Sequence, residues 1–236
     1  MAYSPTFFAS IDAPRSAQAV LGVLGEYVQP SAVIDVGCGT GSWLRGFHEA
    51  GCEVLGVDGP WVQPDQLQIP TTAFRSTDLT RPLQLDRRFD LALSLEVGEH
   101  LPEGAAQTLV QSLTAAAPVV LFSAAIPHQG GEQHVNEQWP AYWARLFAAE
   151  GYGAYDVIRL RVWDDPAVEW WYAQNAVVYA LPASASPALA PCRVEVPRPL
   201  VHPRAYLELH AGLQRQIVPG KVRHALKTMR SRKTRN

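Results

Sequence analysis

The feature that most constrains this chain is a glycine-rich turn between an apolar run and an amphipathic segment. Residues 35–41 read Asp-Val-Gly-Cys-Gly-Thr-Gly, which places glycine at Gly37, Gly39 and Gly41. Glycine allows a tight turn and lets a ligand approach the backbone where a Cβ would clash. The helix predicted to follow offers unpaired amide N–H groups at its N-terminus. The turn therefore predicts a ligand site at the carboxyl end of a strand in an α/β sheet.

Strands and helices are predicted to alternate along the chain, which favours a parallel sheet with right-handed crossovers. We expect strands at 32–37, 52–59, 71–79, 89–97 and 118–127, and helices at 14–28, 42–50 and 102–117, with a Trp-rich helix ending at residue 150. Two further apolar segments, 155–163 and 170–181, are expected to form a closing β-hairpin. The aromatic stripe Trp139, Trp143 and Phe147 has helical spacing and is interpreted as core.

Composition divides the chain into three parts. Residues 1–182 are expected to form the folded domain, 183–205 a Pro- and Ala-rich linker, and 206–236 a helical or flexible basic tail. Residues 221–236 contain seven Lys or Arg and no acid, so this tail has a formal charge of +7. The other residues comprise 13 bases and 22 acids, a formal charge of −9. A body of that charge repels a phosphate backbone, whereas the tail attracts one.

The apolar content of 47% in 236 residues supports a core without disulfides or a structural metal. We expect neither a signal peptide nor a membrane span, because the start is polar and no run of 18 apolar residues occurs. Three cysteines, Cys38, Cys52 and Cys192, without CxxC spacing are typical of a reducing compartment, and we expect a cytoplasmic protein.

The glycine spacing is GxGxG rather than the GxGxxG of dinucleotide-binding proteins, and Asp35 stands two residues before the first glycine. An acid there suits a positively charged amino-acid cofactor better than a pyrophosphate. The segment VIDVGCGTG closely resembles the first motif of class I methyltransferases that use S-adenosylmethionine, and the resemblance covers roughly residues 14–182. It implies a Rossmann-like fold with a mostly parallel, seven-stranded sheet and a C-terminal antiparallel hairpin strand.

The same resemblance implies the cofactor contacts. Asp58 matches the acid that binds the ribose hydroxyls, Asp78 the acid beside the adenine amine, and Leu79 the residue whose N–H faces the ring. The implied cofactor-binding set is Asp35, Gly37, Cys38, Gly39, Gly41, Asp58, Gly59, Asp78, Leu79 and Leu95. Taken singly, the glycine turn could serve another nucleotide, and Asp58 and Asp78 could be helix caps or turn acids.

An acidic–histidine cluster follows the strand predicted at 89–97. Glu96, Glu99 and His100 have i, i+3, i+4 spacing, so one helical turn would gather them on one side. His134 follows the next predicted strand, in the neighbouring loop. Two carboxylates and two imidazoles predict a metal site with open positions. Such a set suits Mn²⁺, Fe²⁺, Co²⁺ or Zn²⁺ at least as well as Mg²⁺, which prefers oxygen ligands.

The ExxEH spacing with a later histidine resembles the small-RNA 2′-O-methyltransferases, whose matching residues bind a divalent metal. A similar EVxEH segment occurs in ubiquinone-pathway O-methyltransferases. We therefore expect His134, His100 and Glu99 to be catalytic. Alternatives stay open: His134 could act as a metal-free general base, with His128 as its rival. Glu96 could bind the cofactor or loop amides, and the Glu99-His100 pair could be a helix cap beside a solvated imidazole.

The favoured function is an O-methyltransferase that acts on a hydroxyl of a small molecule, sugar, glycan or secondary metabolite. The alternative is an RNA 2′-O-methyltransferase or RNA-binding protein recruited by the tail. The −9 body argues against nucleic acid, because tracking RNA normally requires a basic groove. A cofactor-binding scaffold without turnover is a weaker third possibility, since the expected site residues are all present.

Overall fold

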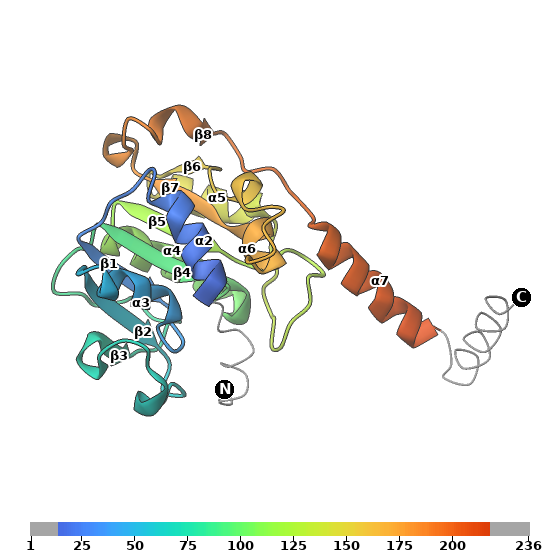
Figure 1. Cartoon of the computed structure of the whole chain (residues 1–236), viewed down its shortest axis with the longest axis horizontal. Coiled ribbons are helices and arrows are strands. Elements are labelled where there is room, and N and C mark those ends of the chain that lie inside the picture. The colour runs from blue at the N-terminus through green and yellow to red at the C-terminus, as the bar shows by residue number, and fades with distance from the viewer. Residues whose placement is uncertain (1–13, 218–236) are drawn as a thin grey trace, which may run out of the picture. The chain divides into compact units, whose positions relative to one another are not determined.

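The computed structural model describes residues 14–217, which form an eight-stranded sheet in the order β3-β2-β1-β4-β5-β7-β6-β8 with helices on both faces (Figure 1). The strands are β1 Ala32–Val36, β2 Glu53–Asp58, β3 Phe74–Ser76, β4 Leu91–Leu95, β5 Val119–Ser123, β6 Gly153–Tyr155, β7 Val177–Ala180 and β8 Arg193–Val194. The α-helices are α2 Pro14–Leu24, α3 Ser42–Glu49, α4 Ala106–Ala116, α5 Pro140–Ala149, α6 Trp170–Asn175 and α7 Pro203–Ile217.

The first five strands are parallel, as the alternation of strand and helix predicts. Asp35 on β1 lies opposite Gly56 on β2 and Leu93 on β4, so the glycine turn leaves the sheet at its centre. The direction in which the chain adds strands to the sheet reverses between β1 and β4. Strands β2 and β3 lie on one side of this point, and β5 lies on the other. Ligands of open α/β sheets bind at such a reversal, beyond the carboxyl ends of the strands.

Each face of the sheet has its own apolar core. Helices α2, α3 and α6 cover one face, and Val20, Leu44 and Tyr172 pack there against inward-facing strand residues. Helices α4 and α5 cover the other face, where Leu109 and Phe147 are fully buried. Burial on both faces explains why β4 and β5 are apolar at every position except Ser94 and Ser123, instead of alternating between apolar and polar residues.

The closing antiparallel pair is confirmed, but β6 shares only Tyr155 with the segment expected at 155–163, and β7 covers only part of 170–181. Strands β6 and β7 pair antiparallel, and β7 also pairs antiparallel with β5. Residues 170–175 form the short helix α6 instead of a strand, and residues 159–161 form a 3₁₀ turn. Trp170 and Trp171 therefore lie on a helix rather than on alternating faces of a strand. The aromatic stripe on α5 is likewise only partly core: Trp143 and Phe147 are buried, whereas Trp139 is exposed.

The sheet has eight strands rather than seven, because Arg193–Val194 pairs antiparallel with β6. This strand lies inside the segment 183–205 that the composition predicts to be a linker. Cys192 also packs against an apolar core, and the guanidinium of Arg159 donates to the carbonyl of Arg198. Residues 192–198 are thus attached to the domain.

The chain divides into two compact units, residues 1–200 and 201–236. Helix α7 opens the second unit with Pro203 in its first turn, where proline is well tolerated. The part of the expected helical or flexible tail after residue 217, which includes the basic residues 221–236, lies outside the described residues. No helix among residues 14–217 is long and apolar enough to cross a membrane.

Candidate functional site

The glycine turn leaves β1 and enters α3, as predicted. Gly37 has a φ of 88°, and Gly41, which precedes α3, has a φ of 81°. A Cβ at Gly37 would overlap the side chain of Val97, which follows β4. The turn therefore lies directly against the loop that bears the acidic–histidine cluster.

Asp35, the acid before the turn, is buried, with only 2% of its surface exposed. Burial and, to a smaller extent, the nearby charge of Asp58 raise the pKa of its carboxyl group to about 7. Burial likewise raises the pKa of the Cys38 thiol in the turn. A carboxylate held in a dry pocket beside a second acid favours a cationic ligand.

Asp58 ends β2 and accepts three hydrogen bonds. The amide of Gly39 donates to Oδ2 at 2.7 Å, and the amide of Gly59 donates to Oδ1 at 2.6 Å. The indole N–H of Trp61 also donates to Oδ1, at 2.8 Å. Burial raises the pKa of Asp58, although these three hydrogen bonds oppose the rise.

Asp78 lies at the same sheet edge, because the amide of its neighbour Thr77 donates to the carbonyl of Asp58 at 2.7 Å. Its carboxylate is exposed and accepts bonds from the hydroxyl and amide of Thr80, which lower its pKa. Leu79 is half-buried and packs against the α4–α5 core, and Leu95 is buried at the end of β4. The predicted cofactor residues thus follow β1, β2, β3 and β4 along one edge.

The acidic–histidine cluster begins where the backbone changes conformation after β4. Glu96 has a φ of 55°, in the left-handed region that disfavours residues with a Cβ. Residues 98–100 then form a 3₁₀ turn. The single helical turn expected over Glu96, Glu99 and His100 therefore does not form. Instead, the structure brings together Glu99, His100 and His134, whose ligand atoms lie within 4.8 Å of one another.

Glu99 is fully buried and makes no well-formed hydrogen bond through either carboxylate oxygen with the described residues. Burial raises the pKa of its carboxyl group well above the usual range, and the charge of Glu96 adds to the rise. A buried carboxylate without firm donors is costly unless a cation compensates it.

The two imidazoles of the cluster face each other edge to face, with ring centroids 4.8 Å apart. Burial lowers the pKa of His100 to about 4, and the neighbouring His134 contributes to the decrease. His100 is therefore neutral near pH 7, the form in which imidazole binds a metal.

Glu96 contacts side-chain amides rather than joining the group of Glu99, His100 and His134 that its sequence spacing predicts. Its carboxylate accepts hydrogen bonds from the side-chain amides of Gln129 at 3.1 Å and Asn175 at 3.1 Å. Gln174 joins this amide network by donating to Gln129 at 2.9 Å. Glu96 is thus held by amides from the loop after β5 and from α6, beside Glu99.

His134 lies in the loop after β5, with Nδ1 at 3.0 Å from Oε1 of Glu137. His128, the rival base, is exposed, and it is not a member of the three-residue group. The sequence analysis missed Glu137, Gln129, Asn175 and Trp61. The i, i+3 spacing of His134 and Glu137 was a usable signal, whereas nothing local links Asn175 to Glu96, which lies 79 residues away.

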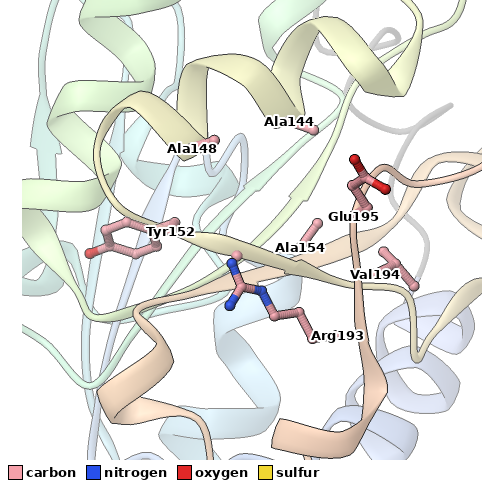
Figure 2. A pocket seen from close by; sticks show the side chains of 8 residues that line it. Ala144, Ala148, Tyr152, Ala154, Arg193, Val194 and Glu195 are labelled. Carbon is pink, nitrogen blue, oxygen red and sulfur yellow. The ribbon is translucent and has the colours of Figure 1, made fainter.

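A shallow groove lies elsewhere, between α5 and the β6–β8 edge (Figure 2). It is lined by Ala144, Ala148, Tyr152, Gly153, Ala154, Arg193, Val194 and Glu195. None of these is a predicted site residue. The acidic and histidine side chains of the predicted site follow β1 to β5 instead.

Similarity to known proteins agrees with this geometry. The methyltransferase domain family matches residues 11–176. A malonyl-[acyl-carrier protein] O-methyltransferase of Pseudescherichia vulneris is 38% identical over 82 residues, which are 34% of this chain and 32% of that relative. The chain therefore matches about a third of the length of this curated relative.

Solved structures share the fold. The methyltransferase domain of bacterial CtHen1-CN has a TM-score of 0.52 at 21% identity and covers 71% of this chain and 98% of that one. CalS10 with bound S-adenosylmethionine, an amino pentose methyltransferase from Micromonospora echinaspora, has a TM-score of 0.54 at 15% identity, with 77% and 98% covered. The chain belongs to the methyltransferase domain family, and its fold is that of the class I S-adenosylmethionine-dependent methyltransferases.

Proposed function

We propose that the protein is an S-adenosylmethionine-dependent O-methyltransferase that acts on a small, uncharged hydroxyl compound with the help of a divalent metal. The observation that carries this proposal is the group Glu99, His100 and His134, with ligand atoms within 4.8 Å. It follows β4 and β5, next to the glycine turn that would hold the methyl donor.

In this proposal the cofactor lies along the edge formed by β1, β2 and β3. Asp35 and Gly37 hold the methionine part, Asp58 binds the ribose hydroxyls, and Asp78 with Leu79 binds the adenine. The contact of Gly37 with Val97 supports this arrangement, because it places the turn beside the loop of Glu99. The sulfonium methyl then faces the acidic–histidine cluster.

The residues present fit a divalent cation. Glu99 supplies buried carboxylate oxygens that lack firm donors, and His100 supplies a neutral imidazole. His134 supplies the second imidazole. Glu96 is proposed as a further ligand or as a support, since its charge already acts on Glu99. A bound divalent cation would lower the pKa of a hydroxyl that it contacts and orient that hydroxyl.

The reaction requires positioning more than covalent catalysis. The methyl carbon moves from sulfur to the acceptor oxygen, the electrons of the broken C–S bond stay on sulfur, and the hydroxyl proton is released. The glycine turn fixes the donor, and the cluster after β4 and β5 fixes the acceptor.

The acceptor class is inferred from charge. The loops after β4 and β5, residues 96–105 and 124–139, contain no Lys or Arg but include five glutamates. Phosphate-bearing acceptors need cations at the site, so a sugar, glycan or other metabolite hydroxyl is favoured over RNA. Two of the proteins named above, the malonyl-[acyl-carrier protein] O-methyltransferase and the amino pentose methyltransferase, are named for small acceptor groups, which supports a small acceptor here.

The test is methylation of two acceptor panels by the full chain with S-adenosylmethionine and Mn²⁺. One panel holds neutral glycosides and phenols, and the other holds short RNA oligonucleotides. We expect a mass gain of one CH₂ group in the first panel only, and the gain should be smaller in His134→Ala at limiting Mn²⁺. Methylation of the RNA panel alone would overturn the acceptor class.

A further inference from the structure

The loop 128–137, which follows β5 and bears His134, is organised by a single carboxylate. Oε2 of Glu137 accepts the backbone amide of His128 at 2.7 Å. Oε1 accepts the amide of Gly130 at 2.9 Å and lies 3.0 Å from Nδ1 of His134. Glu137 is half-buried, with 20% of its side chain exposed, and its contact with His134 is partly buried, whereas its contacts with the amides of His128 and Gly130 are exposed.

The contact with Glu137 determines which nitrogen of His134 has the proton. An ionised carboxylate can only accept hydrogen bonds, so Nδ1 must be the protonated nitrogen. In the neutral ring Nε2 then has the free lone pair. Metal-binding histidines usually have this arrangement, with the second nitrogen bonded to a carboxylate or carbonyl.

The space beside Nε2 on the other side of the ring is kept open by Gly131, because a Cβ at this position would lie 2.3 Å from Nε2. The ring therefore lies between the backbone of Gly131 and the carboxylate of Glu137. The same loop contains Gln129, whose amide donates to Glu96. By closing the loop, Glu137 holds both His134 and Gln129 against the cluster.

We propose that Glu137 is the positioning residue of this site: it fixes the Nδ1–H tautomer and the orientation of His134, so that Nε2 faces Glu99 and His100. This inference rests on the proposed function in one respect, namely that the ligand of Nε2 is a divalent cation. The role of Glu137 toward His134 itself needs no metal.

The test uses Glu137→Gln in the full chain. Glutamine has the same size, but it has one acceptor oxygen where the carboxylate has two, so the Nδ1–H tautomer is no longer enforced. We expect ¹⁵N NMR of the metal-free protein to show a mixture of His134 tautomers instead of one. Calorimetric titration with Mn²⁺ or Co²⁺ should show an affinity about 10–100-fold lower. Glu132→Gln, a change at an exposed acid of the same loop, is the matched control and should leave both readouts unchanged.

A conservative variant separates positioning from loop stability. Glu137→Asp keeps the charge and both acceptor oxygens, and we expect it to restore the Nδ1–H tautomer and most of the metal affinity. A wild-type tautomer and wild-type affinity in Glu137→Gln would overturn the inference. If instead the wild-type chain binds no divalent metal, the proposed function fails in its metal step, while the tautomer measurement still decides the role of Glu137.

Discussion

The indole N–H of Trp61 donates a 2.8 Å hydrogen bond to Oδ1 of Asp58, the carboxylate proposed to bind the cofactor ribose. The amide of Gly59 donates to the same oxygen at 2.6 Å. An oxygen with two lone pairs has then reached its usual capacity. The ribose hydroxyls must therefore share Asp58 with Trp61 or displace its indole.

Trp61→Phe tests this competition. Phenylalanine keeps an aromatic ring over Gly59 but removes the donor, so Asp58 becomes free for the ribose. A hydrogen bond of this kind contributes about 0.5–1.5 kcal/mol. We expect S-adenosylmethionine affinity to rise by about 2–10-fold in calorimetry, and Trp139→Phe, at an exposed tryptophan, should have no effect. A loss of affinity would show that Trp61 contacts the cofactor directly.

Asp58→Ala should weaken S-adenosylmethionine binding by at least about tenfold. Two charge-assisted hydrogen bonds to the ribose diol contribute about 1.5–3 kcal/mol each, and about 1.4 kcal/mol corresponds to a tenfold change. Asp65→Ala, at an exposed acid after the same strand, is the control. Unchanged affinity in Asp58→Ala would remove this residue from the cofactor site.

The raised pKa of Asp35 predicts that the stability of the fold and the affinity for the cofactor depend on pH in opposite directions. Its folded-state pKa of about 7 exceeds the unfolded value of about 3.9. The favourable contribution of the protonated form is thus complete below about pH 4 and is lost as the pH rises through 7. Asp35→Asn should raise the Tm at pH 8 and change it little at pH 4, as measured by thermal melts.

The cofactor affinity should respond in the other direction. A cationic ligand favours ionised Asp35, so S-adenosylmethionine affinity of the wild type should rise between pH 6 and pH 8. The affinity of Asp35→Asn should be lower at pH 8 and nearly independent of pH over this range. Identical pH profiles for the two proteins would contradict a role for Asp35 in binding the cation.

The positions of the residues proposed to bind the cofactor could be predicted because the signals are local. Asp35 and the glycines occupy one strand–turn–helix, and Asp58 stands at a strand end that apolar spacing identifies. The arrangement of the residues proposed to hold the metal depends on contacts that sequence spacing does not show. The left-handed φ of Glu96 ends the expected helical turn, and Asn175 reaches Glu96 from the distant helix α6.

The error in the closing hairpin has a similar cause. Residues 170–175 are rich in aromatic and apolar side chains, which favours a strand when only local propensity is considered. In the structure Tyr172 packs edge to face on Trp43 of α3, with ring centroids 4.9 Å apart. Tertiary packing of this kind selects a short helix, and no pattern within six residues indicates it.

Gly37→Ala should destabilise the fold, whereas Gly22→Ala should stabilise it. A Cβ at Gly37 would overlap Val97, and the φ of 88° is unfavourable for alanine. Gly22 lies within α2 with nothing within 4 Å of its added Cβ, so alanine there should add about 0.5–1 kcal/mol. Urea denaturation measures both. Equal midpoints for Gly37→Ala and the wild type would contradict the close contact between the turn and Val97.

Chelation should abolish turnover while leaving cofactor affinity nearly unchanged. The acids proposed to bind the cofactor lie at the ends of β1, β2 and β3, whereas Glu99, His100 and His134 form a separate group after β4 and β5. Glu99 and Glu96 lie close enough that one charge raises the pKa of the other, and a divalent cation would stabilise both in ionised form. His134→Ala should raise the Mn²⁺ concentration needed for half-maximal rate. His128→Ala, at the exposed histidine of the same loop, is the matched control.

The alternative mechanism, in which His134 is a metal-free general base, makes a different prediction. It predicts full activity in the presence of chelator and a rate that rises with pH through the usual pKa range of histidine. Undiminished turnover after exhaustive chelation, with no metal found by elemental analysis, would decide for that rival.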